Sequence, residues 1–242
     1  MAGFISLRAP SGQAFEAFLA QPERPNGRGL VLLPEVYNVN RWIRSVALRH
    51  AAQGYTVLVP DLFWRQQPGG HYEYDQPEPA RAQGAQVDVD AVVGDVGTAA
   101  GALRLRLGGQ APVAALGYCL GGRLALLAAA REVVDAAVSY YGVQLERHLD
   151  ELALLRRPAL LHFGDRDPWV PAEVLTQVRA RLLGLNGIES HVFTGAGHGF
   201  DRDGQPTFDA LASQRARELS RGWLQRHLQP STQPGTAQPS RS

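Results

Sequence analysis

Short apolar runs alternate with longer amphipathic segments along most of the chain. The apolar runs predict strands at 29–34, 55–60, 111–118, 135–142, 158–164 and 189–195, with an earlier strand at 14–20. The amphipathic segments predict helices at 40–53, 86–107, 120–131, 171–184 and 207–228. The later strands are almost continuously Val, Leu and Ala, which is typical of a parallel sheet covered on both faces. The pattern therefore predicts one doubly wound α/β domain over residues 1–228.

The end of the chain has a different composition. Residues 229–242 are rich in Pro, Ser, Thr and Gln and offer no apolar face, so we expect this tail to be disordered. The start of the chain, MAGFISLRAP, has too few apolar residues for a signal peptide, and no run approaches the length of a membrane span.

Composition and charge narrow the classes of function. The chain has 242 residues, of which 45% are hydrophobic, enough for a substantial core. A net charge of +1 gives no electrostatic footprint for nucleic acid or an anionic membrane, so we expect neither as a partner. A single cysteine allows no internal disulfide and favours a reducing cytoplasm. All 24 basic residues are arginine, which excludes lysine-based catalysis.

That single cysteine, Cys119, sits in the frame Gly-Tyr-Cys-Leu-Gly, between a predicted strand and a predicted helix. A nucleophile on such a sharp turn needs a glycine on either side, because a Cβ atom at 117 or 121 would clash with the backbone. The helix N-terminus favours the thiolate, and the amide of Leu120 is placed to receive an oxyanion. The alternative is a buried cysteine used only for packing beside a glycine-rich turn.

An acid and a histidine follow in the chain order that this turn requires. His198 lies in the glycine-rich loop TGAGHGFDR, directly after a predicted strand. Asp165 and Asp167 compete as the acid that orients it, and we favour Asp167 because the rigid turn PWVP follows it. Asp167 is otherwise explained as a turn cap before proline.

Several motifs together resemble the dienelactone hydrolase family, which are cysteine-based α/β-hydrolases also called carboxymethylenebutenolidases. The resemblance runs from about residue 4 to about 228, without a large insertion. It rests on the motifs LLPEVYNVN, VLVPDLFWRQQPG, VVGDV, GYCLGGRLA, SYYGV, FGDRDPWVP and GAGHGFDR. It implies an α/β-hydrolase fold without a large cap domain, a Cys119–His198–Asp167 triad, and no metal or organic cofactor.

The resemblance also implies roles for residues around the triad. Glu35 is expected to contact the resting thiol and to swing away when substrate arrives, and the amide of Val36 is the second oxyanion donor. The family usually has glycine where this chain has Asn38. Arg202 is expected to clamp a substrate carboxylate, although a solvated loop arginine is the alternative.

Further pocket residues are expected from the stretch before the long central helix and from two aromatic positions. Arg81 is the only arginine in that stretch, where Tyr72 and Tyr74 are displaced from the family's place for a tyrosine. Tyr37 and Trp169 are predicted to line the pocket, with core packing as the alternative for both.

The activity expected from these residues is the opening of a carboxylated enol lactone, of the type that converts dienelactone to maleylacetate, through an acyl-enzyme. A general carboxylesterase or thioesterase on the same scaffold is one alternative. A non-catalytic binding protein with a relict triad is another, because a fold alone does not give a function. We expect a small-molecule lactone or ester as the only partner of a cytoplasmic monomer.

Overall fold

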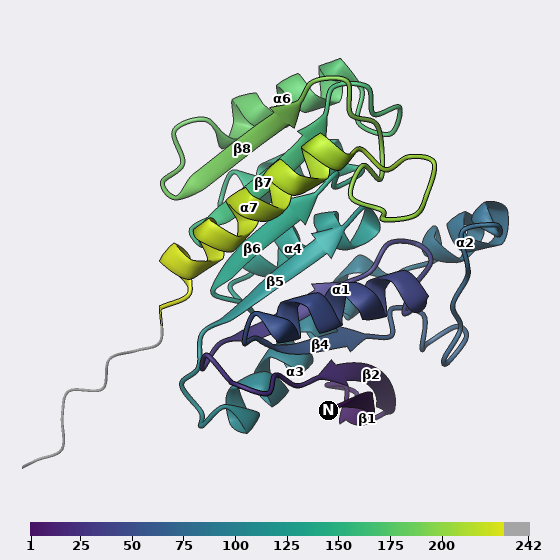
Figure 1. Ribbon diagram of the computed structural model, residues 1–242, viewed down its shortest axis with the longest axis vertical. Coiled ribbons are helices and arrows are strands. Elements are labelled where there is room, and N and C mark those ends of the chain that lie inside the picture. The colour runs from purple at the N-terminus through teal and green to yellow at the C-terminus, as the bar shows by residue number, and fades with distance from the viewer. Residues whose placement is uncertain (230–242) are drawn as a thin grey trace, which may run out of the picture.

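A computed structural model describes residues 1–229 of the chain. Its centre is a sheet with the strand order β1-β2-β4-β3-β5-β6-β7-β8 (Figure 1). The strands are Ala2–Arg8, Ala14–Ala20, Gly29–Leu33, Thr56–Pro60, Val113–Tyr118, Ala136–Tyr140, Ala159–Gly164 and Ile188–Phe193, numbered β1 to β8. From β4 to β8 the neighbouring strands run parallel, whereas β1 pairs with β2 and β2 with β4 in the antiparallel direction.

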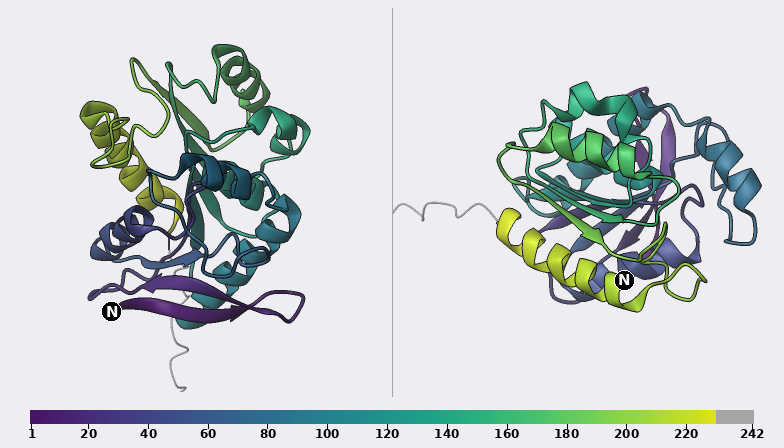
Figure 2. Two further views of the ribbon diagram at one scale, coloured as in Figure 1. Left: turned by 90° about the vertical axis from the view of Figure 1, so that its right-hand side faces the viewer. Right: turned by 90° about the horizontal axis from the view of Figure 1, so that it is seen from above.

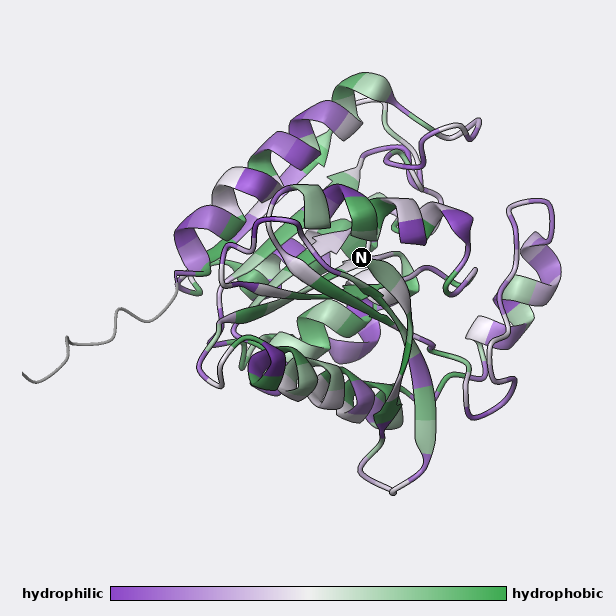
Figure 3. Cartoon of the chain, turned by 60° about the horizontal axis from the view of Figure 1, so that its bottom comes forward, coloured by the Kyte–Doolittle hydropathy of each residue, from purple (hydrophilic) through white to green (hydrophobic). Residues whose placement is uncertain are grey.

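Helices cover both faces of the sheet (Figure 2). The helices are α1 Arg41–Ala52, α2 Pro77–Gly84, α3 Val89–Arg106, α4 Leu120–Ala130, α5 Leu149–Leu152, α6 Ala172–Leu182 and α7 Ala210–His227, with a 3-10 turn η1 at Leu145–His148. Side chains of α1 and α7 form the core on one face, and those of α3, α4, α5 and α6 form it on the other. The apolar strands therefore lie between two helical layers (Figure 3).

The helix α4 differs from the others in being buried along almost all of its length. Its sequence LGGRLALLAAA contains one charged residue, Arg123, and every residue from Leu120 to Ala129 is buried. A helix that is apolar all round belongs in the interior of a domain. It packs on β3, β5 and β6 of the sheet and also contacts the neighbouring helices α3 and α5.

The predicted strands and helices are all present, with ends that differ by a few residues. Four elements were not predicted, namely β1, α2, η1 and α5. The predicted disorder at 229–242 falls almost wholly outside the described residues. Within residues 1–229, no helix is both long and apolar enough to cross a membrane.

Five polar residues lie at the carboxyl ends of the parallel strands. Glu35, Cys119, Gln144, Asp167 and His198 follow β3, β5, β6, β7 and β8 respectively. Because these strands are parallel, their carboxyl ends meet at the same edge, where open α/β sheets bind their ligands.

Candidate active site

Cys119 occupies a sharp turn between β5 and α4. Its backbone has φ 55° and ψ −115°, a conformation that is costly for a residue with a side chain. A Cβ atom on Gly117 would lie 1.9 Å from the carbonyl oxygen of Gly121, and one on Gly121 would lie 2.2 Å from that of Leu33. Both glycines are therefore sterically required, as the sequence frame predicts.

The two residues whose backbone amides are the predicted oxyanion donors line the cavity that also contains Cys119. They are Leu120, the first residue of α4, and Val36, in the loop after β3. Neither amide donates a backbone hydrogen bond elsewhere in the described chain. The end of α2 packs on this point, because a Cβ on Gly84 would lie 2.7 Å from Cγ1 of Val36. The unpredicted helix α2 thus packs against the side chain of Val36.

His198 is held between Cys119 and Asp167. Its Nδ1 lies 2.8 Å from Oδ2 of Asp167, whose Oδ1 accepts a 2.8 Å hydrogen bond from the amide of Trp169. Burial lowers the pKa of His198, but the neighbouring Cys119 and the hydrogen bond to Asp167 outweigh it and raise the pKa to about 9. The geometry therefore favours a protonated imidazole beside the sulfur.

Asp165, the competing acid, faces away from this pair. Its carboxylate accepts a 2.7 Å hydrogen bond from the amide of Gly195 and so supports the start of the His198 loop. The ring of Tyr141 meets the His198 ring edge-on at 4.9 Å and limits its movement. Of the two acids, the structure brings only Asp167 to His198.

A buried ionic cluster fixes the far side of the His198 loop. The carboxylate of Asp201 is completely buried and accepts hydrogen bonds from Ser213 at 2.6 Å and Arg217 at 2.5 Å, while Arg49 lies 3.5 Å away. Arg49 belongs to α1 and the other two partners to α7. The loop that carries His198 is therefore tied to both helices on that face of the sheet.

Glu35 is buried against Arg202 and Tyr74. The Nε of Arg202 donates to its two oxygens at 2.8 and 3.0 Å, and the hydroxyl of Tyr74 donates at 3.1 Å. Burial lowers the pKa of Arg202, but the charge of Glu35 outweighs it and raises the pKa above its usual value. Among the described residues, Glu35 makes no hydrogen bond to Cys119, the partner that the resemblance implies for the resting enzyme.

The loop around Asn38 shows what replaces the glycine expected there. Asn38 has φ 56°, in the left-handed region that asparagine tolerates better than most residues. Its buried amide donates to Asp61 and to the carbonyl of Gly70, both at 2.6 Å, and its carbonyl accepts from Leu62. The side chain therefore ties the loop after β3 to the loop after β4.

The cavity at this edge has a volume of about 240 Å³. Eight predicted residues line it, namely Val36, Tyr37, Arg81, Cys119, Leu120, Trp169, His198 and Arg202. Asp167 and Glu35 stand behind His198 and Arg202. Trp169 is 54% exposed, with the guanidinium of Arg81 5.8 Å from its ring, so this pair forms the outer rim.

Sequence reasoning did not assign a role to four residues of this site. Arg123 and Gln144 line the cavity, Tyr74 holds Glu35, and Tyr141 packs on His198. Arg123 follows Cys119 by one helical turn and Gln144 follows a strand, so their places along the chain carried a signal. No three His, Cys, Asp or Glu side chains group as metal ligands within residues 1–229.

The sheet order and the turn at Cys119 define the fold of an α/β-hydrolase. The Dienelactone hydrolase family matches residues 15–228. The chain is 35% identical over 219 residues to a carboxymethylenebutenolidase of Pseudomonas putida, covering 88% of this chain and 92% of the relative. Carboxymethylenebutenolidase 1 of Cupriavidus pinatubonensis is 31% identical over 212 residues, with 86% and 90% covered.

A solved structure agrees in fold. It is a dienelactone hydrolase-like promiscuous phosphotriesterase from metagenomic libraries, with a TM-score of 0.77 and 20% identity over 94% of this chain and 99% of the other. The chain belongs to the dienelactone hydrolase family and is a hydrolase of the carboxylic-ester class.

Proposed function

We propose that the chain opens a carboxylated enol lactone with a Cys119–His198–Asp167 triad, through an acyl-enzyme. One observation carries the proposal: the imidazole of His198 is hydrogen-bonded to Asp167 on one side and adjoins Cys119, on its strained turn, on the other. A nucleophile, a base and an orienting acid in this arrangement are the recurring parts of acyl transfer.

In the first half-reaction, the thiolate of Cys119 attacks the lactone carbonyl carbon and forms the C–S bond. The negative charge moves to the carbonyl oxygen, which the amides of Val36 and Leu120 bind. The ring C–O bond then breaks, and the enol oxygen takes the proton of the His198 imidazolium. The opened product stays attached through a thioester.

In the second half-reaction, neutral His198 removes a proton from water as the water oxygen attacks the thioester carbonyl. The C–S bond breaks, the acid leaves, and the thiolate–imidazolium pair is restored. A thiolate is also a good leaving group, so this site suits activated enol lactones and esters better than amides.

The proposed place for the substrate carboxylate is the outer end of Arg202. Only its Nε is used by Glu35, and within the described residues its two terminal nitrogens have no hydrogen-bond partner. Those nitrogens form a planar fork that matches a carboxylate. The relatives named as carboxymethylenebutenolidases support a lactone substrate.

The test is capture of the acyl-enzyme. The protein is mixed with a carboxylated enol lactone or an activated ester and quenched in acid, and the mass of the Cys119 peptide is measured. We expect an acyl adduct on Cys119 that appears before the steady state and is absent in Cys119→Ala. A Cys119→Ala variant with full turnover would refute the triad, and loss of the adduct in His198→Ala would argue against a non-catalytic binding protein.

The nature of the substrate separates the proposal from a general esterase or thioesterase. A panel of carboxylated lactones and neutral short-chain esters gives the ratio of their kcat/KM values. A ratio near one would favour the general esterase, because the fork of Arg202 would then contribute nothing.

A further inference from the structure

The only charged residue of α4 points at the reaction site. Arg123 stands on the first turn of the helix, where its amide donates to the carbonyl of Cys119 at 3.2 Å. Its side chain lines the cavity together with Cys119, although the residue is only 6% exposed. An arginine in an otherwise apolar, buried helix is costly unless its charge is compensated.

Within residues 1–229, no carboxylate forms an ion pair with Arg123. One terminal nitrogen donates to the side-chain carbonyl of Gln144, a neutral partner, and the buried Nε has no partner. Burial lowers the pKa of Arg123, whereas the charge of Glu35 raises that of Arg202. Of these two arginines in the cavity wall, Arg202 is neutralised within the protein and Arg123 is not.

The two arginines approach Cys119 from opposite sides of the sheet. Arg123 comes from α4, whose apolar neighbours belong to the core shared with α3, α5 and α6. Arg202 lies over Tyr37 and Tyr74, and Tyr74 packs on the core shared with α1 and α7. Cys119 follows the strand between these two layers, and Arg123 and Arg202 both line the cavity that contains it.

We propose that Arg123 and Gln144 form a second anion subsite, on the α4 side of Cys119, and that the pocket takes dianionic esters or lactones. This inference deepens the proposed function and rests on it for the identity of the reaction. One carboxylate of the substrate binds the fork of Arg202. A second anionic group on the acyl part binds Arg123, with the amide nitrogen of Gln144 as a further donor.

Desolvation explains why Arg123 discriminates strongly. A charged hydrogen bond in a buried site is worth more than one at the surface, and a buried arginine without its anion carries the cost of its own dehydration. A ligand with the second anionic group removes that cost, whereas a ligand with one carboxylate leaves it in place. We therefore expect dianions to bind roughly ten- to a hundred-fold more tightly than monoanions of equal length.

The test uses Cys119 as the reporter and does not depend on turnover. Cys119 is the only cysteine, so iodoacetamide reports occupation of the cavity without ambiguity. The dicarboxylates succinate, glutarate, adipate and pimelate are compared with the monocarboxylates of equal chain length as protectants against alkylation. We expect at least one dicarboxylate to protect at a concentration about ten-fold or more below its monocarboxylate partner.

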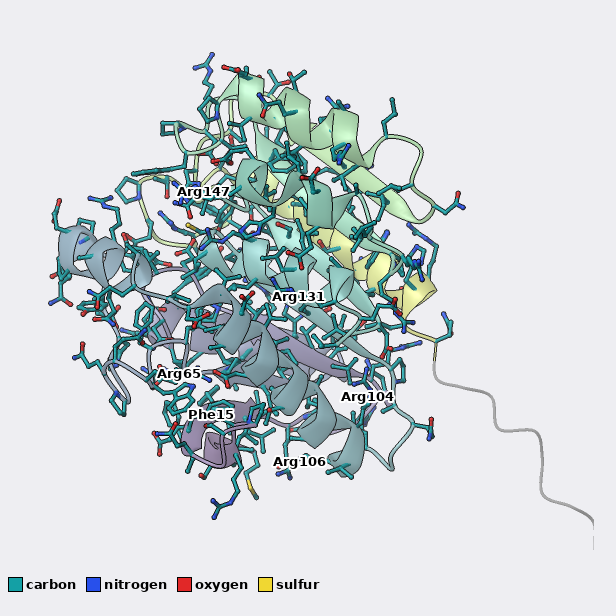
Figure 4. The ribbon with its side chains drawn as sticks, turned by 180° about the vertical axis from the view of Figure 1, so that it is seen from behind. Phe15, Arg65, Arg104, Arg106, Arg131 and Arg147 are labelled. Atoms are coloured by element: carbon teal, nitrogen blue, oxygen red, sulfur yellow. The ribbon has the colours of Figure 1, made fainter. Side chains whose placement is uncertain are left out.

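Three variants assign that preference to the subsite. Arg123→Met keeps the length of the side chain without the charge and should abolish the preference. Gln144→Asn keeps an amide and tolerates the left-handed backbone at this position, where φ is 58°, but shortens the reach and should reduce the preference. Arg147→Gln is the matched control and should keep the preference. Arg147 is exposed (labelled in Figure 4), its charge acts on Arg123, and it does not line the cavity.

The outcomes separate the subsite from the reaction. Equal protection by mono- and dicarboxylates, or a preference that survives Arg123→Met, would overturn the proposal. If Arg123→Met does not fold, an unchanged preference in Gln144→Asn overturns it as well. A preference that depends on Arg123 in a protein that forms no acyl-Cys119 would support the subsite and refute the proposed function.

Discussion

Replacing Asp167 by asparagine tests the triad at the point where the structure is most specific. One carboxylate oxygen accepts from the amide of Trp169 at 2.8 Å, and the other lies 2.8 Å from Nδ1 of His198. In Asp167→Asn, the side-chain carbonyl oxygen of the asparagine can still accept the hydrogen bond from the amide of Trp169. The NH₂ group of the asparagine then faces Nδ1 of His198. Nδ1 must then accept, and the imidazole proton moves to Nε2.

That tautomer cannot accept a proton on the nitrogen that faces the reaction, and the negative charge that holds the imidazolium is gone. The loss expected from a wrong tautomer in an otherwise intact triad is roughly 10³- to 10⁴-fold in kcat, or about 4–5.5 kcal/mol in the activation barrier. The pKa of His198, raised to about 9 partly by Asp167, should fall. The decline of kcat/KM at alkaline pH should therefore move to lower pH in the variant.

Asp165→Asn is the matched control, because it makes the same chemical change two residues away. Its oxygen accepts only from the exposed amide of Gly195, and a neutral carbonyl can keep that bond. We expect a change within a few-fold. The assay is the steady-state rate with an activated ester across pH 6 to 10, with near-UV circular dichroism to confirm folding. Equal losses in the two variants, or less than about ten-fold in Asp167→Asn, would refute the assignment.

Three further predictions follow from other contacts. Arg202→Ala should lower the ratio of kcat/KM for carboxylated lactones to that for neutral esters by roughly thirty- to a thousand-fold, with partial recovery in Arg202→Lys; an unchanged ratio would assign Arg202 a structural role. Gly121→Ala places a Cβ 2.2 Å from a backbone oxygen and should lower the free energy of unfolding in urea by several kcal/mol, so a stable variant would contradict the steric argument. Burial lowers the pKa of His50 and His162 to about 3, so the unfolded chain binds more protons below pH 6.5 and stability falls as the pH drops. Between pH 7 and pH 5, His50 and His162 each lower the free energy of unfolding by about 2 kcal/mol. His198 raises it by about 1 kcal/mol over the same range, because its pKa is raised in the folded state. Equal free energies of unfolding at the two pH values would contradict this prediction.

Elements with a strong local pattern were predictable from the sequence. The buried strands β3 to β7 are nearly continuous apolar runs, and the carboxyl ends of β5 and β7 place Cys119 and Asp167 at one edge, where His198 follows the predicted strand β8. The edge strand β1 was missed because its sequence AGFISLR contains no continuous apolar run, and six of its seven residues are exposed or only partly buried. The helix α2 was missed because two prolines stand in its first turn.

The partners of the site residues depend on tertiary contacts that local patterns do not encode. Glu35 and Arg202 are 167 residues apart in the chain, and Tyr74 joins them from a third segment. Arg123 was not predicted as a site residue because its motif was interpreted only for Cys119. The lack of a carboxylate partner for Arg123 depends on the positions of side chains that are distant in the sequence. The sequence therefore predicted a nucleophile and its chemistry, whereas the balance of charge in the cavity depends on contacts between distant segments.

The lone thiol at Cys119 has a consequence for oxidative damage. The chain contains no other cysteine, so a sulfenic acid formed at Cys119 has no resolving partner with which to make an internal disulfide. Its return to the reduced state depends on an external thiol small enough to enter a cavity where the residue is 8% exposed. A small reductant such as glutathione should therefore restore an oxidised molecule, whereas a protein reductant must first open the rim formed by Trp169 and Arg81.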